Sequence, residues 1–232
     1  MTQTIAPSTV DPALEPVANA LIAAASSFYQ RGWMLGTSGS VSARLGHDPL
    51  QVLITVSGKA KGDLIPQDML RVTDDGQIFK TLGDPKASSE SFYKGQPRPS
   101  GETLVHEAIY RKFDDAGAVY HVHSVDNTLC SQLVAPGQTL DLRDLEMLKG
   151  LGRWEPGQTV KIPVVPNHLH IPTLAEAVAQ AAVYDVPGVL VRGHGIYTWG
   201  QDMARARRHT EIFEFLFSYF TRALQLGLVE RP

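Results

Sequence analysis

Apolar residues recur at helical spacing near both ends of the chain. The pattern predicts a helix from about Pro12 to Trp33 and a longer one from about Asp202 to Leu226. An apolar stripe that includes several aromatic residues is typical of a helix facing the core or another subunit, rather than of a cofactor site. The two stripes consist of Leu14, Val17, Leu21, Ala24, Ala25 and Phe28, and of Ile212, Phe213, Leu216, Phe217 and Phe220.

Between these helices, short apolar runs alternate with further helical segments, and the resulting fold class is α/β. The short connections favour many antiparallel strand pairs. Strands are expected at Ser40–Arg44, at Val52–Val56, from Gly117 to His121 or His123, at Val160–Val165 and at Gly188–Val191, with a hairpin around Asp74-Asp75-Gly76. Helices are expected at Gly101–Phe113, from near Asp126, and at Leu174–Tyr184, and a long loop is expected over 83–101.

Composition narrows the class of protein. The 232 residues are 43% hydrophobic and 19% charged, which suits one globular domain over residues 11–232 after a loose tail at 1–10. A net charge of −3 gives no support for nucleic-acid binding, and no apolar run reaches the roughly 20 residues of a membrane span. The single cysteine, Cys130, and the absence of a secretory pattern favour a reducing compartment, the cytoplasm.

The strongest chemical signal is the pair His121-Val122-His123 at the end of an apolar run. Residues two apart on a strand face the same side, so both imidazoles are able to reach one zinc ion. A third ligand is offered by His194, which stands between two glycines directly after another expected strand. Three histidines with one open position are typical of a catalytic zinc site.

A second pair, His168-Leu169-His170, lies between Pro166 and Pro172. A regular central strand is not expected between two prolines. We therefore expect these histidines to cap a helix, line a loop or face solvent, and not to bind metal.

Two glutamates are candidates for acid–base or substrate-binding roles. Glu146 lies among Leu145, Met147 and Leu148, and partial desolvation there would raise its pKa; the alternative is a surface charge paired with Lys149. Glu102 follows Pro99-Ser100-Gly101 at a helix start. The alternative to a chemical role for Glu102 is a structural one, in which Ser100 caps the helix and Glu102 lies favourably against the helix dipole.

Three glycine- and serine-containing loops are candidates for an anion site, because exposed N–H groups and hydroxyls bind phosphate. Each loop taken alone is typical of a simple turn, and their joint occurrence favours a phosphorylated substrate. They cover Gly36–Ser40, Ser57-Gly58-Lys59 and Ser100-Gly101, with Ser40, Ser57, Gly58, Ser100 and Gly101 as the expected substrate contacts.

Taken in order, these motifs resemble the class II aldolase/adducin family over about residues 12–226. The matching stretches are Gly39-Ser40-Val41-Ser42, Ser57-Gly58, Pro99-Ser100-Gly101-Glu102, His121-Val122-His123 and His194-Gly195. Ser40 departs from the pattern, since aldolases of the family carry Asn there. Within the family, Glu146-Met147-Leu148-Lys149-Gly150 and His194-Gly195-Ile196-Tyr197-Thr198-Trp199-Gly200 resemble members that dehydrate a ketose phosphate.

This resemblance implies a three-layer α/β/α fold with a mixed, largely antiparallel sheet, and a homotetramer. It implies zinc on His121, His123 and His194, with Glu146 as the acid–base residue. Glu102 occupies the catalytic position of the aldolases and is assigned here to substrate positioning. Two alternatives stay open: an aldolase or 4-epimerase acting on another ketose phosphate, and a non-enzymatic, adducin-like interaction domain.

Overall fold

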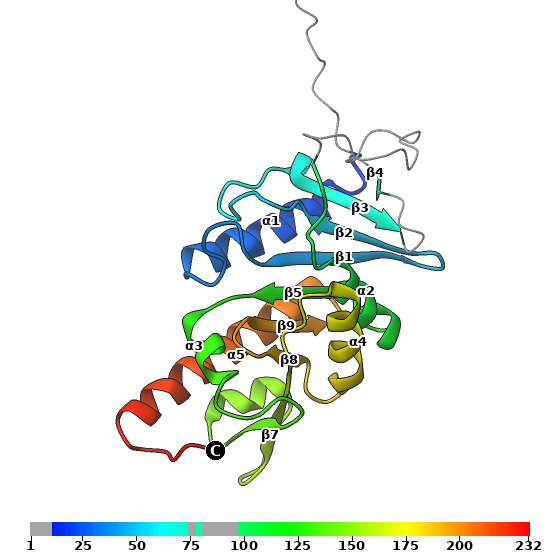
Figure 1. The fold of residues 1–232 in the computed structure, drawn as a ribbon. Coiled ribbons are helices and arrows are strands. Elements are labelled where there is room, and N and C mark those ends of the chain that lie inside the picture. Colours follow the sequence, from blue (N-terminus) through cyan, green and yellow to red (C-terminus); the bar gives the residue numbers. More distant parts are fainter. Residues whose placement is uncertain (1–10, 74–77, 80–96) are drawn as a thin grey trace, which may run out of the picture.

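The computed structural model describes residues 11–73, 78–79 and 97–232. Within these residues one sheet of nine strands forms the middle layer, in the order β4-β3-β2-β1-β5-β9-β8-β7-β6. Figure 1 shows the strands descending from β4 at the top to β7 near the bottom. The strands are β1 (Ser40–His47), β2 (Leu50–Thr55), β3 (Met69–Thr73), β4 (Ile78–Phe79), β5 (Ala118–Val122), β6 (Thr139–Arg143), β7 (Thr159–Val165), β8 (Gly188–Val191) and β9 (Gly195–Gly200).

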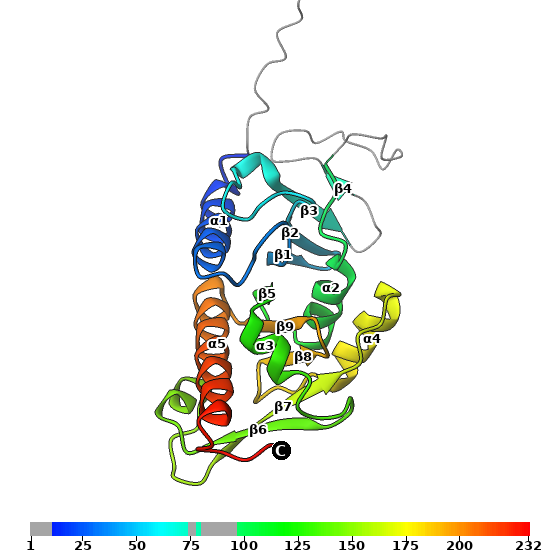
Figure 2. The same ribbon diagram turned by 60° about the vertical axis from the view of Figure 1, so that its left-hand side comes forward.

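Helices cover both faces of this sheet. Figure 2 shows α1 and α5 along one face and α2 and α4 along the other, with α3 at the end of β5. Every pair of neighbouring strands is antiparallel except β7 and β8, which are parallel. The expected three-layer fold with a mixed, largely antiparallel sheet is confirmed. The helices are α1 (Glu15–Gln30), α2 (Thr103–Lys112), α3 (Val125–Cys130), α4 (Ile171–Ala181) and α5 (Met203–Gln225), with short 3₁₀ turns η1 (Pro66–Asp68) and η3 (Glu146–Leu151).

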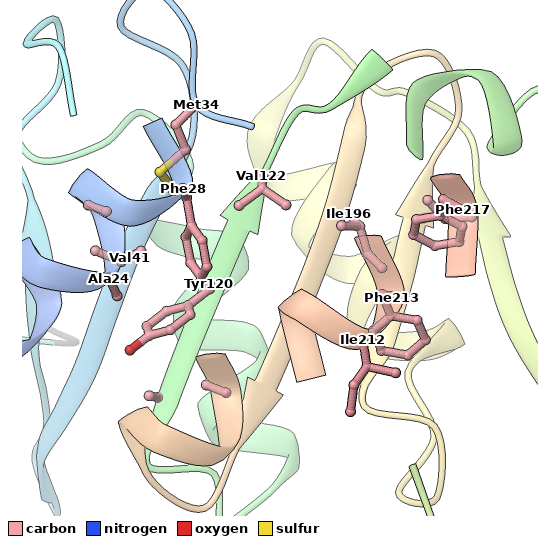
Figure 3. Close-up of a cluster of buried hydrophobic side chains, with 14 of the residues drawn as sticks. Ala24, Phe28, Met34, Val41, Tyr120, Val122, Ile196, Ile212, Phe213 and Phe217 are labelled. Carbon is pink, nitrogen blue, oxygen red and sulfur yellow. The ribbon is translucent and has the colours of Figure 1, made fainter. Parts of the chain in front are cut away.

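Successive side chains of the central strands point to opposite faces of the sheet, so the apolar core forms two layers, one on each face. On β5, Tyr120 and Val122 pack toward α1 and α5, where they join Phe28 and Phe213 in the cluster drawn in Figure 3. The intervening Val119 packs toward α2 and α4. Because side chains two apart share a face, His121 lies on the same side as Val119, toward α2.

Most expected elements are present with shifted ends. The stripe of α5 is buried as expected, and β8 has the predicted bounds. The hydrophobic pattern does not predict β6 or β9. The turn expected at 74–76 and most of the loop expected over 83–101 lie outside the described residues, as does the tail at 1–10. None of the helices described is long and apolar enough to cross a membrane.

Candidate metal centre

Four side chains from three parts of the chain meet at one point near the end of β5. The cluster consists of Glu102, His121, His123 and His194, whose candidate ligand atoms all lie within 4.8 Å of one another. His121 Nε2 is 2.6 Å from His123 Nε2 and 3.3 Å from His194 Nε2. The two carboxylate oxygens of Glu102 lie 3.0 Å from His121 Nε2 and 3.1 Å from His194 Nε2.

This donor set suits a metal ion. Three ring nitrogens pointing at one another would repel through their lone pairs unless a proton or a cation lay between them. Ligands of a tetrahedral ion with bonds of about 2.0–2.1 Å are about 3.3 Å apart, close to most of the distances in the cluster. Neutral imidazoles and an ionised carboxylate are the forms that bind a metal.

His121 and His123 lie at the end of β5, as the spacing of the pair predicts. His121 is the fourth residue of the strand and its side chain is fully buried. His123 follows the strand, and its backbone N–H donates to the carbonyl of Trp33 at 2.8 Å. Burial, together with the nearby His121 and His194, lowers the pKa of His123 far below its usual value, so the ring is neutral.

The orientation of His121 is fixed by β9. Its Nδ1 lies 2.9 Å from the carbonyl oxygen of Ile196, which accepts only from a protonated nitrogen. The proton on Nδ1 leaves Nε2 with a free lone pair directed at the cluster.

Two glycines permit the close approach of backbone that the cluster requires. A Cβ on Gly195 would lie 2.4 Å from the Val122 carbonyl oxygen and 2.8 Å from His123 Cδ2. A Cβ on Gly39 would lie 2.8 Å from the His121 carbonyl oxygen, and Gly39 has a positive φ of 73°. Any larger residue at either position would displace the strand end that carries the histidines.

Helix α3 ties the two histidine-bearing segments together. Ser124 caps the helix by accepting from the Asn127 N–H at 2.9 Å. Thr128 Oγ1 donates to the Ser124 carbonyl at 2.8 Å and lies 3.3 Å from the His194 carbonyl oxygen. Ser131 Oγ accepts from the Gly193 N–H at 2.8 Å. The separation between the pair and the late histidine is therefore held by hydrogen bonds.

Glu102 joins the cluster from the N-terminus of α2, where it is the N-cap residue. Burial by itself would raise the pKa of Glu102, but the neighbouring imidazoles of His121 and His194 lower it well below its usual value. The carboxylate is therefore ionised.

The three candidate anion loops lie side by side next to this cluster. The Ser57 N–H donates to the Arg98 carbonyl at 2.7 Å, and the Ser100 N–H donates to the Thr55 carbonyl at 3.1 Å. These bonds join the second loop to the third, which leads directly into Glu102. The first loop ends at Gly39, against the backbone of His121.

The family and the fold of this chain follow from comparisons to known proteins. The family model of the class II aldolase and adducin N-terminal domain matches residues 19–220. The chain belongs to the class II aldolase and adducin family.

Curated relatives from this family share much of the sequence. A methylthioribulose-1-phosphate dehydratase of Microcystis aeruginosa is 40% identical over 209 residues, which cover 89% of this chain and 95% of the relative. The enzyme of the same name from Persephonella marina is 39% identical over 191 residues, 82% of each chain.

Solved structures of this family share the fold. The YgbL protein of Escherichia coli superposes with a TM-score of 0.72 at 26% identity, covering 95% of this chain and 93% of YgbL. An L-fuculose 1-phosphate aldolase superposes with a TM-score of 0.70 at 19% identity, covering 98% of this chain and 92% of the aldolase. At this low identity, the similarity to the aldolase shows a shared fold and nothing more.

Two candidate residues of this family member lie differently from expectation. The side chain of Glu146 is 81% exposed, and its carboxylate pairs with Lys149 at 2.8 Å. Of the two alternatives for Glu146, the structure therefore shows the surface charge paired with Lys149 and not the desolvated carboxylate. No hydrogen bond or ion pair among the described residues joins Glu146 to the cluster. Ser40 is fully buried, and its hydroxyl lies 2.8 Å from His106 Nε2. This burial argues against the expected contact between the Ser40 hydroxyl and a phosphate.

The remaining candidates are two glycines and a serine of the anion loops, and the second histidine pair. Gly58 and Gly101 stand in open positions, since a Cβ added at either would meet nothing within 4 Å among the described residues. Ser100 Oγ accepts from the Glu102 N–H at 3.3 Å, but the helix cap itself is Glu102. His170 Nδ1 lies 2.9 Å from Thr173 Oγ1, and His170 is not among the four residues of the cluster.

A buried polar row beside the cluster is not predicted by the sequence analysis. His106 lies one helical turn after Glu102, with Nε2 against Ser40 and Nδ1 2.8 Å from Ser42 Oγ. Ser42 Oγ also lies 2.8 Å from the Tyr110 hydroxyl. Burial lowers the pKa of His106 to about 3, so the ring is neutral. The spacing of Glu102, His106 and Tyr110 on one helix face is the signal that could have found this row.

Proposed function

We propose that this chain is a zinc-dependent dehydratase that converts 5-methylthioribulose 1-phosphate to 5-methylthio-2,3-dioxopentyl phosphate in methionine salvage. The observation that carries the proposal is the three-histidine cluster with an adjoining carboxylate, beside loops suited to an anion. Dehydratases of this name are similar over most of the chain. We further propose a single catalytic domain over 11–232, acting in the cytoplasm as a homotetramer.

His121, His123 and His194 would hold the zinc ion through Nε2, with Glu102 beside them. A zinc ion held there supplies Lewis acidity that makes the proton next to the substrate carbonyl easier to remove. The protonated Nδ1 of His121, bonded to Ile196, keeps the ring in the tautomer that leaves Nε2 available.

The reaction removes the proton on C3 and the hydroxyl on C4 as one water molecule. A carboxylate takes the C3 proton while the C4 hydroxyl leaves with a proton from an acid. The product of this step is an enol with its hydroxyl on C3; it gains a proton at C4, loses the proton of the C3 hydroxyl and becomes the 2,3-diketone. A single glutamate that first accepts and then returns a proton balances the sequence.

The proposal gives the two glutamates different roles. Glu146 transfers protons, and Glu102 orients the substrate at the cluster. Because Glu146 is exposed and unconnected to the cluster within the described part of its own chain, its role requires a second copy of the chain to bring it there. The proposed oligomer is therefore part of the mechanism.

The phosphate is assigned to the loops at Ser57-Gly58 and Ser100-Gly101. These loops offer two hydroxyls and two glycines without side chains that would hinder an anion, and the hydrogen bonds between the loops keep them side by side. Anchoring the phosphate fixes the distance from the reacting carbons to the cluster.

The deciding experiment is incubation of the purified, zinc-loaded protein with 5-methylthioribulose 1-phosphate. Formation of the diketone phosphate, measured by mass spectrometry, is the expected result. Cleavage into two smaller carbonyl products would favour the aldolase alternative, and an altered configuration at C4 would favour the epimerase. Absence of any turnover with zinc bound would favour an adducin-like interaction domain.

A further inference from the structure

One buried lysine lies between two of the candidate anion loops. Lys61 follows β2, and its residue surface is only 1% exposed, which places it among the largest fully buried side chains. Its Nζ donates to the carbonyl of Thr37 at 2.9 Å and to that of Lys59 at 3.1 Å. The side chain therefore joins the loop at Gly36–Ser40 to the loop that begins at Ser57.

No carboxylate pairs with Lys61 among the described residues. The neighbouring Lys59 is paired, since its Nζ lies 2.5 Å from Asp68 Oδ2. A buried cation that contacts only carbonyl oxygens is costly, because neutral dipoles replace its hydration and no opposite charge offsets it. Burial lowers the pKa of Lys61 to about 8, so the amine still carries its charge at neutral pH.

The loop that Lys61 holds through the Thr37 carbonyl leads to the metal cluster. The loop that Lys61 holds ends at Gly39, whose backbone lies against the His121 carbonyl. A negative group bound on these loops would therefore be near both the lysine and the strand end that carries His121.

We propose that Lys61 is the buried counter-charge of the substrate's phosphate: it holds the two loops in place, and the bound phosphate compensates its charge. It is a positioning residue, because its amine bonds to the loops rather than to the reacting atoms. The proposal rests on the proposed function only for the identity of the anion as a phosphate ester.

If Lys61 only joined the two loops by hydrogen bonds, its positive charge would not be needed. Variants that separate the charge of the side chain from its hydrogen bonds therefore test the proposal. Lys61→Gln keeps a donor without charge, Lys61→Met keeps the length without either, and Lys61→Arg keeps the charge. Thermal unfolding of each purified variant would be followed at neutral pH with rising inorganic phosphate, against chloride at equal ionic strength. Lys161→Met, which removes a surface lysine paired with Asp141, is the control.

Phosphate should raise the melting temperature of the wild type, the control and Lys61→Arg. Lys61→Gln and Lys61→Met should bind phosphate about ten- to a hundredfold more weakly, the usual effect of losing one charged hydrogen-bonding partner. Equal phosphate stabilisation of wild type and Lys61→Gln would overturn the proposal and leave the dehydratase function intact. Loss of the response in Lys61→Arg but not in Lys61→Gln would also overturn it.

Substrate kinetics provide a second measurement if Lys61→Met does not fold. In Lys61→Gln, KM for the phosphorylated substrate should rise about tenfold or more while kcat and metal content stay near the wild-type values. A fall in kcat at unchanged KM would contradict the assignment. If the wild type itself shows no response to phosphate, the anion site is absent and the proposal fails, whereas metal-dependent dehydration is still tested separately by product analysis.

Discussion

Tyr197 stacks on His121, with ring centroids 3.9 Å apart and ring planes within 11° of parallel. The two residues face each other in the register of β5 and β9. The stack covers one face of the imidazole, and the hydrogen bond to Ile196 fixes its edge. His121 is therefore oriented before any ion binds, and a ligand set that is already oriented binds with a smaller loss of conformational entropy.

Removal of the cluster histidines should abolish metal binding. His121→Ala, His123→Ala and His194→Ala each leave two histidines, too few for a stable zinc site. We expect elemental analysis to find one zinc per wild-type chain and a large loss in each variant. His168→Ala and His170→Ala provide the matched control, because they remove a pair with the same spacing that lies outside the cluster. Full zinc retention in all three cluster variants would refute the assignment.

The two glutamates should differ in how their loss affects turnover. Glu146→Gln keeps the size of the side chain but is unable to accept a proton, so kcat should fall by about 10²–10⁴ with zinc retained. Glu102→Gln should mainly raise KM. Both are measured at saturating substrate with the metal content checked. A dead Glu102→Gln and a mildly impaired Glu146→Gln would reverse the roles and favour the aldolase-like alternative.

Mixed oligomers would show whether Glu146 acts on the site of another copy. His121→Ala and Glu146→Gln are each expected to be inactive. Co-expression of the two chains with different tags would yield mixed oligomers in which an intact cluster meets an intact Glu146. Recovery of activity in these oligomers is the expected result, and activity no higher than that of the parents would place both groups in one chain.

The loop serines should respond according to their exposure. Ser57→Ala and Ser100→Ala should raise KM with little change in kcat, because the phosphate is held equally in the ground and transition states. Ser40→Ala should instead lower the free energy of unfolding by about 1–3 kcal/mol, since it leaves buried His106 Nε2 without its partner. Steady-state kinetics and urea unfolding would separate the two effects. Equal turnover of unphosphorylated methylthioribulose would argue against the phosphate site.

Stability should depend on pH through Glu214, a residue of α5 that is 2% exposed. Its Oε1 accepts from Asn127 Nδ2 at 2.7 Å, and burial raises its pKa to about 7. Between about pH 4.5 and pH 7 the folded protein binds more protons at this group than the unfolded chain does, so its contribution to stability is lost as pH rises.

Glu214→Gln removes this ionisation. Relative to the variant, the wild type should lose up to about 3 kcal/mol of unfolding free energy between about pH 5 and pH 8. Urea unfolding across this range provides the measurement. Glu211→Gln, which removes a more exposed carboxylate of the same helix, is the control and should show a flatter dependence. A constant difference between wild type and Glu214→Gln would contradict the prediction.

Features that depend on residues close together in the chain could be predicted from the sequence. The two-residue period of a strand places His121 and His123 correctly, and the glycines around His194 mark a turn at a strand end. Long-range pairing has no such local signal. The stack of Tyr197 on His121 depends on the register of two strands about 75 residues apart, and β9 itself begins directly after the His194 turn.

Local sequence context does not predict the side-chain direction at two positions. Glu146 has apolar neighbours in sequence, but the turn of η3 buries Leu148 and directs Glu146 to solvent. Ser40 ends a candidate anion loop and begins β1 as expected, yet its hydroxyl faces the interior, toward His106 on α2. In both cases the side-chain direction followed from a tertiary contact that apolar composition does not encode.

The order of strands in the sheet differs from their order of synthesis. β9, the last strand in the described sequence, lies between β5 and β8 in the middle of the sheet. A protein is synthesised from its N-terminus, so the edge of β5 that pairs with β9 has no partner strand until β9 has been made. His194 and the carbonyl of Ile196 arrive with that same segment. The chain therefore completes the candidate ligand set at the same stage of synthesis at which it supplies the strand that closes the sheet.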